Sequence, residues 1–142
     1  MKTEIALPDW LVARGWPSHL PTDADAMALA LELARENIAH GGGPFGALVR
    51  EEPSGRIVSV GVNRVTAASN PVLHAEVVAI ALAGREHWEP GEATLFTTCE
   101  PCIMCLGAVH WSGIQRIVHA ARREDAEAIG FSEGAGCTEL WS

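Results

Sequence analysis

Two short motifs restrict the fold of this chain most strongly, because their side chains have to meet at one point. The first is His74-Ala75-Glu76 and the second is Pro101-Cys102-Ile103-Met104-Cys105. Residues three apart share a helix face, so the two thiols of the second motif lie together in the first turn of a helix. Residues two apart do not share a helix face. His74 and Glu76 can therefore both reach the same bound ion only if they lie where a helix begins. The sequence therefore predicts a fold in which the N-terminal ends of two helices meet.

The residue types in these motifs favour a metal centre. A helix N-terminus stabilises thiolate over thiol, and zinc binds the deprotonated form. His74, Cys102 and Cys105 are three ligands, which leave a tetrahedral zinc one open position for water, as in catalytic sites. Zinc lowers the pKa of that water to about 7. Glu76 is not needed as a ligand, so we predict that it carries protons between the water and a substrate.

Taken singly, these residues also fit other interpretations than a catalytic zinc. Cys-x-x-Cys alone fits a redox pair or half of a structural zinc site, and Cys99 could complete a structural site with three cysteines and one histidine. His74 alone would be an ordinary helix residue. Three of the four cysteines lie within seven residues, which favours metal binding in a reducing cytosol over disulfides. The two motifs together favour the catalytic zinc.

Composition restricts the partners of this chain. Its 142 residues suit one domain, residues 1–142, and 48% of them are hydrophobic. No apolar stretch approaches the ~20 residues that span a bilayer, and no secretory signal is visible, so we expect a cytoplasmic protein without membrane contact. The formal net charge is −8, with the ten Lys and Arg residues scattered along the chain. This charge favours a small neutral substrate and argues against nucleic acid.

Periodicity and turn residues predict the order of the elements. Residues 1–21 form an irregular N-terminal arm, and 131–142 form a short C-terminal tail. Helices are predicted from Thr22 or Asp23 to Gly41, at 73–83, at 101–112 and at 124–129; strands are predicted at 45–50, 56–63, 93–98 and 114–120. The first two strands form a hairpin, and the later βαβ units imply parallel strands. We therefore predict an α/β fold, a three-layer α/β/α sandwich with a mixed four-stranded sheet.

The pattern His-x-Glu followed by Pro-Cys-x-x-Cys is the known motif of zinc deaminases. Over residues 22–133 the chain resembles the cytidine deaminase-like superfamily, and within it the bacterial guanine deaminases. The matching stretches are Gly42 to Gly46, Asn63, Asn70-Pro71 before His74-Ala75-Glu76-Val77, Cys99 to Cys102, Met104 to Ala108, Trp111, Glu127-Ala128 and Gly130-Phe131. The resemblance implies the cytidine deaminase type of sandwich.

The resemblance also implies contacts with a purine. Asn63 would hydrogen-bond the base, Phe45 would stack on it, Trp111 would help to close the pocket, and Ala75 would also contact the substrate. Without the resemblance, Phe45 and Trp111 would be interpreted as core residues and Asn63 as the end of a strand. Acidic residues near the C-terminus read the 2-amino edge or move protons in such enzymes. Glu139 is the preferred catalytic candidate and Glu133 a substrate-binding one; the alternative is that both are solvated charges.

The chain departs from this family at its C-terminus. Relatives of this kind continue through a fifth strand and a closing helix, so a sheet of four strands with a bare edge is expected here. A truncated form, an altered reading frame and a natural short form all fit this pattern. A homodimer is expected from the resemblance and from the apolar helix that carries Ile103, Leu106, Val109 and Trp111.

The resemblance implies the hydrolysis of guanine to xanthine and ammonia. One alternative is another deaminase, acting on tRNA adenosine, on cytosine, or on an aminated triazine or pterin. A second alternative is a zinc-binding module that has lost activity with its C-terminus.

Overall fold

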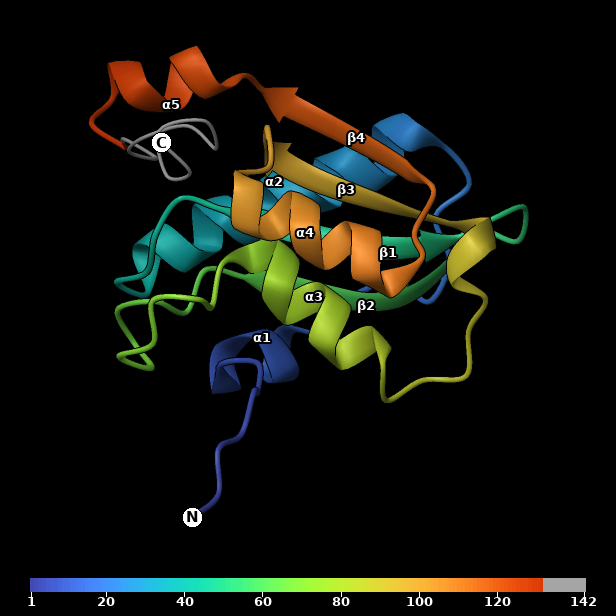
Figure 1. Ribbon diagram of the computed structural model, residues 1–142, viewed down its shortest axis with the longest axis horizontal. Helices are drawn as coiled ribbons and strands as arrows, with labels where there is room; N and C mark the ends of the chain where they lie inside the picture. The colour runs from blue at the N-terminus through green and yellow to red at the C-terminus, as the bar shows by residue number, and fades with distance from the viewer. Residues whose placement is uncertain (132–142) are drawn as a thin grey trace, which may run out of the picture.

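The computed structural model describes residues 1–131 of the chain. Ten elements follow one another in chain order, as Figure 1 shows. They are α1 (Asp9–Arg14), α2 (Asp23–Ala39), β1 (Gly46–Glu51), β2 (Arg56–Val62), α3 (Ala75–Ala83), the 3₁₀ helix η1 (Pro90–Glu92), β3 (Ala93–Cys99), α4 (Ile103–Ser112), β4 (Arg116–Ala121) and α5 (Arg123–Ala128). No helix within this part of the chain is both long and apolar enough to cross a membrane.

The four strands form one mixed sheet in the order β2-β1-β3-β4. β1 pairs antiparallel with β2 and with β3, and β3 pairs parallel with β4. The predicted hairpin and the predicted parallel pair around α4 are therefore confirmed. β2 and β3 also run in the same direction, but β1 lies between them, so α3 crosses over one intervening strand. In the described part of the chain, β2 and β4 form the two edges of the sheet.

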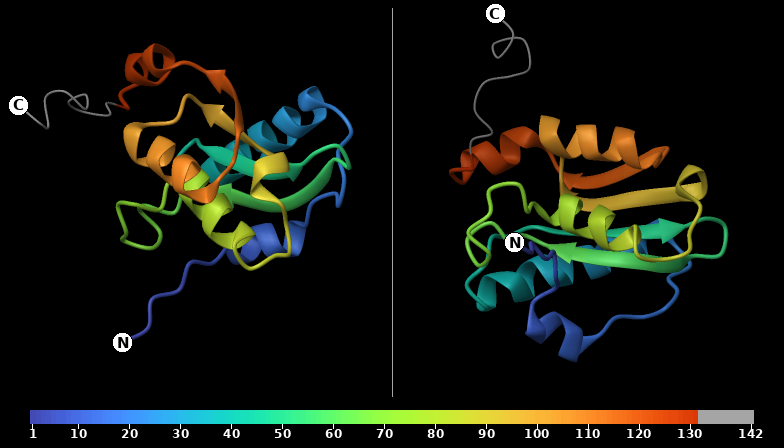
Figure 2. Two further views of the ribbon diagram at one scale, coloured as in Figure 1. Left: turned by 45° about the vertical axis from the view of Figure 1, so that its right-hand side comes forward. Right: turned by 60° about the horizontal axis from the view of Figure 1, so that its bottom comes forward.

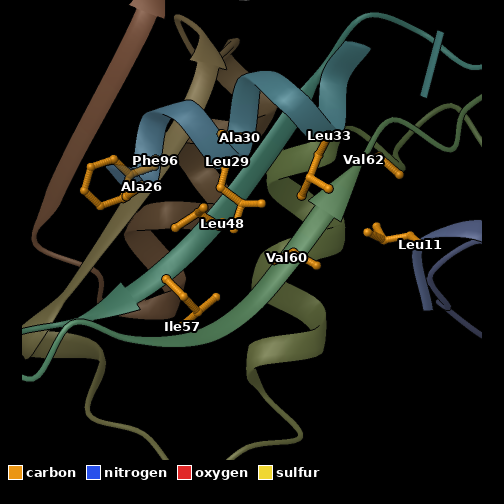
Figure 3. Packing of buried hydrophobic residues seen from close by; sticks show 10 residues of the cluster. All are labelled: Leu11, Ala26, Leu29, Ala30, Leu33, Leu48, Ile57, Val60, Val62 and Phe96. Atoms are coloured by element: carbon orange, nitrogen blue, oxygen red, sulfur yellow. The ribbon is translucent and has the colours of Figure 1, made fainter. Parts of the chain in front are cut away.

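The strands alternate their side chains between two hydrophobic clusters, one on each face of the sheet. Leu48 of β1 faces α2 and packs with Leu29, Leu33 and Phe96, as Figure 3 shows. Its neighbours on β1 face the other way, toward the alanines of α3. Helices therefore cover both faces, with α3 and α4 on one side and α2 on the other, as both views of Figure 2 show. This confirms the three-layer α/β/α sandwich and the mixed four-stranded sheet.

The helix α3 lies unusually close to the sheet because β2 has no side chain at Gly61. A Cβ atom added there would collide with the carbonyl oxygen of Ala75 and lie 2.7 Å from the backbone nitrogen of Ala79. Small residues on the facing side of α3 make the approach possible from the helix, since Ala75 and Ala79 are both fully buried. This contact sets the distance between the sheet and the helix that starts at His74.

The N-terminal arm is more ordered than predicted, because residues 9–14 form the helix α1. Pro8 stands at its N-cap, where a missing N–H costs nothing, and Gly15 ends it with φ +69°. Leu11 is fully buried in the α2-side cluster. Trp10 stacks on His40, with ring centroids 4.7 Å apart. The prediction of an irregular arm is therefore wrong for this segment, since six residues between Pro and Gly gave too little periodicity to reveal a helix.

Candidate active site

The two motifs meet where α3 and α4 begin. His74 is the N-cap of α3 and Cys102 is the N-cap of α4, and neither side chain caps its own helix. Both side chains turn toward each other instead. His74 Nδ1 lies 3.6 Å from Cys102 Sγ and 3.6 Å from Cys105 Sγ. The structure thus brings together the N-terminal ends of two helices, as the spacing of the motifs predicts.

These three side chains fit a zinc ion. A tetrahedral zinc with Zn–S about 2.3 Å and Zn–N about 2.05 Å separates its nitrogen and sulfur ligands by about 3.6 Å. Both nitrogen–sulfur distances in the site equal this value. Within residues 1–131, His74, Cys102 and Cys105 are the one group of three or more His, Cys, Asp or Glu side chains arranged to hold a metal. The set supplies three ligands and leaves the fourth position open.

Cys99 does not belong to this group of ligands. It ends β3, and its Sγ lies 3.9 Å from the carbonyl oxygen of Arg122, the N-cap of α5. The thiol therefore contacts the backbone that joins β4 to α5. The structural site with three cysteines and one histidine is not supported.

The pKa values of the two ligand thiols are shifted in opposite directions. The hydrogen bond with Cys105, together with that with His74, lowers the pKa of Cys102 to about 4, against the opposing effect of burial. The same hydrogen bond and burial raise the pKa of Cys105. The metal-free site therefore holds a thiolate beside a thiol, and a cation that binds both has to displace the proton of Cys105.

Glu76 lies in the first turn of α3 with only 7% of its surface exposed. Thr97 Oγ1 of β3 donates a hydrogen bond to Glu76 Oε1 at 3.0 Å. Burial raises the pKa of the carboxyl group, and the hydrogen bond from Thr97 partly opposes this. A carboxyl group with a raised pKa beside an open metal position takes up a proton more readily than an ordinary carboxylate, as a proton carrier has to.

A cavity of about 500 Å³ opens in front of these residues. Six of the residues predicted for the site line it: Phe45, Asn63, His74, Ala75, Glu76 and Cys102. The other lining residues are Gly43, Val65, Thr66, Pro71, Cys99, Glu100, Ile103, Met104, Ala126 and Phe131. Cys105 is fully buried behind them. The cavity thus joins a mostly apolar wall to the carboxylate and the ligand set.

Asn63 presents a donor to this cavity. Its Oδ1 accepts a hydrogen bond from the backbone N–H of Val65 at 3.2 Å, which fixes the orientation of the amide. With Oδ1 engaged by Val65, the Nδ2 group is the donor that the Asn63 side chain can offer to a ligand. Asn63 N also donates to the carbonyl oxygen of Phe45 at 3.2 Å. Phe45 meets the edge of Phe131, with ring centroids 5.1 Å apart.

Trp111 is predicted for the site but is not brought to it. Trp111 is 87% exposed and does not line the cavity. It lies near the C-terminal end of α4, and nine residues of helix span about 13 Å from the end that carries Cys102. Glu133 and Glu139 lie outside the described residues, so their roles stay predictions.

Three contacts at the site were not predicted from the sequence. Thr97 bonds Glu76 across 21 positions of the chain, and no local pattern reveals such a pair. Glu100 directly precedes the second motif, and its Oε2 accepts the N–H of Arg123 at 2.9 Å, which ties α5 to the cavity. The third contact is that of Phe131 with Phe45 at the cavity. The sequence points to Phe131 only through the family resemblance, although aromatic residues at both ends of the matched region could have indicated a shared pocket.

The fold and the site together define a zinc-dependent deaminase class, and comparison with known proteins agrees. Residues 20–121 match the family model described as the cytidine and deoxycytidylate deaminase zinc-binding region. The chain belongs to this family. The match includes all three ligands and Glu76.

Relatives within the family have different substrates. The chain is 40% identical over 107 residues to a guanine deaminase of Bacillus subtilis, covering 73% of this chain and 67% of that protein. A solved structure of a guanine deaminase from Nitrosomonas europaea superposes with a TM-score of 0.86 at 41% identity, covering 95% of this chain and 79% of the other. A tRNA-specific adenosine deaminase of Haemophilus influenzae is 36% identical, covering 76% of this chain and 63% of that protein.

Proposed function

We propose that this protein hydrolyses guanine to xanthine and ammonia. The observation that carries the proposal is the buried Glu76 carboxyl group beside a three-ligand metal site that opens into an aromatic-walled cavity. The similarity to two guanine deaminases at 40% and 41% identity supports guanine over other bases.

Glu76 moves the protons of the proposed reaction. When bound, zinc supplies Lewis-acid activation of a water molecule. Glu76 accepts a proton from that water as oxygen bonds to the carbon that carries the 2-amino group, and passes it to the adjacent ring nitrogen. It then delivers the second water proton to the amino group, the carbon–nitrogen bond breaks, and ammonia leaves. Its raised pKa suits this exchange, because the carboxyl group has to hold and release a proton at the same pH.

The cavity suits a flat neutral base. Phe45 offers an aromatic surface for stacking, and the Asn63 amide nitrogen can donate to an acceptor atom on the ring edge. The net charge of −8 supports a neutral small molecule over a polynucleotide, whose binding depends on basic residues.

The test is xanthine formation from guanine, followed by ultraviolet absorbance with ammonia assayed in parallel, on protein confirmed to hold zinc. Glu76→Gln is the matched control, because it removes the titratable group and keeps a side chain of the same size. We expect both products from the wild type and no turnover from the variant, with one zinc retained by each. Guanine left intact while the same preparation deaminates adenine, cytosine or another aminated heterocycle would refute the choice of substrate.

A tRNA adenosine deaminase is the second candidate, and the Haemophilus relative favours it. A gel-shift with a tRNA anticodon stem-loop at moderate salt separates it from the first, because a free-base enzyme should leave the stem-loop unbound. A zinc-binding module without activity would retain zinc, and neither the wild type nor Glu76→Gln would turn over any base.

We further propose a cytoplasmic homodimer that uses the outer face of α4. Ile103, Leu106 and Trp111 are exposed on that helix, which favours an apolar interface. Val109, expected in the same face, is buried in the α3-side cluster. Sedimentation of a monomer at working concentration would exclude the dimer.

A further inference from the structure

The C-terminal turn of α2 holds two walls of the cavity through one side chain. Asn37 is only 3% exposed, and its Nδ2 group donates to two backbone carbonyl oxygens. One belongs to Gly43, at 2.9 Å, and the other to Asn63, at 3.1 Å. Both of these residues line the cavity. An amide nitrogen carries two protons, so this group uses its full donor capacity on the substrate-facing loops.

The loop between α2 and β1 is built around this amide. The backbone carbonyl oxygen of Asn37 accepts the N–H of Gly42 at 2.8 Å. A Cβ atom at Gly42 would collide with the Asn37 side chain, and one at Gly43 would lie 3.1 Å from Cγ of Asn63. The glycines after α2 therefore do more than end the helix, because they leave room for two amide side chains.

The same interactions reach the aromatic wall. The carbonyl oxygen of Gly43 accepts both the Asn37 amide and the backbone N–H of Phe45, the latter at 2.9 Å. Asn63 N in turn donates to the carbonyl oxygen of Phe45. One buried amide thus fixes the backbone of Gly43 and Asn63 directly and that of Phe45 through a shared acceptor.

We propose that Asn37 is a positioning residue for substrate recognition, a role that rests on the deaminase activity proposed above. It acts through Asn63 and Phe45, and it contacts neither the substrate nor the metal ligands. Removal of its two donors takes one hydrogen bond from each of the two part-buried carbonyl groups and lets both walls shift. Misplaced substrate contacts then lower the rate of reaction without loss of the metal.

The test is a double-mutant cycle between Asn37→Leu and Asn63→Ala on zinc-loaded protein. Leucine has nearly the shape of asparagine and no donor. We expect Asn37→Leu to lower kcat/KM for guanine by about 30-fold, which corresponds to about 2 kcal/mol. In the Asn63→Ala background the same substitution should cost less than about 5-fold, because the Asn63 side chain, which is the substrate contact that Asn37 positions most directly, is already absent. Zinc content should stay at one per chain.

Two further variants keep this test decisive. Gly42→Ala pushes the same amide aside from the loop, and we expect it to lower kcat/KM in the same direction, which serves if Asn37→Leu does not fold. Leu29→Ala, also buried on α2 but remote from the cavity, should lower the free energy of unfolding and leave kcat/KM unchanged. Unchanged kcat/KM in both Asn37→Leu and Gly42→Ala, or an equal loss with and without Asn63, would overturn the positioning role. A wild type that leaves guanine untouched would instead refute the proposed function itself.

Discussion

The close approach of α3 to β2 predicts that Gly61→Ala damages the metal site from a distance. The new Cβ atom would lie 2.7 Å from the backbone nitrogen of Ala79, and ordinary contact begins at 3.4 Å. The overlap with the carbonyl oxygen of Ala75 is larger still, so the helix has to move outward by more than about 0.7 Å. Backbone atoms form the obstacle, so no side-chain rotation can relieve it. Overpacking of this kind lowers the free energy of unfolding by about 1–3 kcal/mol.

The displaced helix carries His74 and Glu76 at its start, while the two cysteine ligands stay on α4. A misplacement near 1 Å reduces catalysis by about 100-fold. We expect Gly61→Ala to weaken zinc binding by about 10-fold in competition with a chelator, and to lower kcat by 10-fold or more. Urea unfolding of the zinc-loaded protein measures the loss of stability.

Gly91→Ala is the matched control, because no atom lies within 4 Å of a Cβ placed there. It should change neither stability nor zinc affinity. If Gly61→Ala unfolds at the same urea concentration as the wild type and binds zinc equally well, the reasoning is refuted. A variant that loses stability but keeps its zinc affinity and kcat would show that this contact does not set the ligand geometry.

Three further outcomes follow from the site. Burial raises the pKa of Glu76 above its ordinary 4.5, so the folded metal-free protein binds that proton more tightly than the unfolded chain and loses stability as pH rises. Urea unfolding of metal-free Glu76→Gln should therefore show higher stability than the wild type at pH 7, with the difference vanishing below about pH 4.5. Thr97→Val removes the hydrogen bond to Glu76 and should lower kcat about 10-fold with zinc retained. Thr97→Ser keeps the hydroxyl group and should have most of the wild-type kcat. Equal kcat values for the two variants would contradict a role for this hydrogen bond. Cys102 has a pKa of about 4 and the pKa of Cys105 is raised, so zinc binding at pH 7 should release the proton of Cys105. The zinc affinity should therefore increase as pH rises. Calorimetry in buffers of different ionisation enthalpy measures the released proton, and it would detect none if both thiols were already deprotonated.

The metal ligands could be predicted from the sequence because their geometry is local. The spacing of Cys102 and Cys105 fixes their shared helix face, and the spacing of His74 and Glu76 requires a helix entrance. The strands and the hairpin could also be predicted, since turn residues separate the strands. The position of β1 between β2 and β3 could not be predicted, because strand order depends on pairing between distant segments.

The residues that hold the substrate contacts in place, such as Asn37, are positioned by tertiary contacts. Asn37 bonds Asn63 across 26 positions, so an asparagine in the last turn of a helix gave no local sign of its role. The exposure of Trp111 was missed for a related reason. Periodicity groups the apolar residues of α4 on a face but cannot show which part of that face another element covers.

The ligand set has a consequence for how a substrate arrives. Two thiolates and a neutral imidazole cancel the charge of a divalent cation, so the loaded centre presents no net electric charge to its surroundings. The chain's excess of eight negative charges acts elsewhere, as a field that repels polyanions and leaves an uncharged molecule unaffected. Capture of a neutral base should thus be independent of ionic strength, while any encounter with a nucleic acid would quicken as salt screens the repulsion.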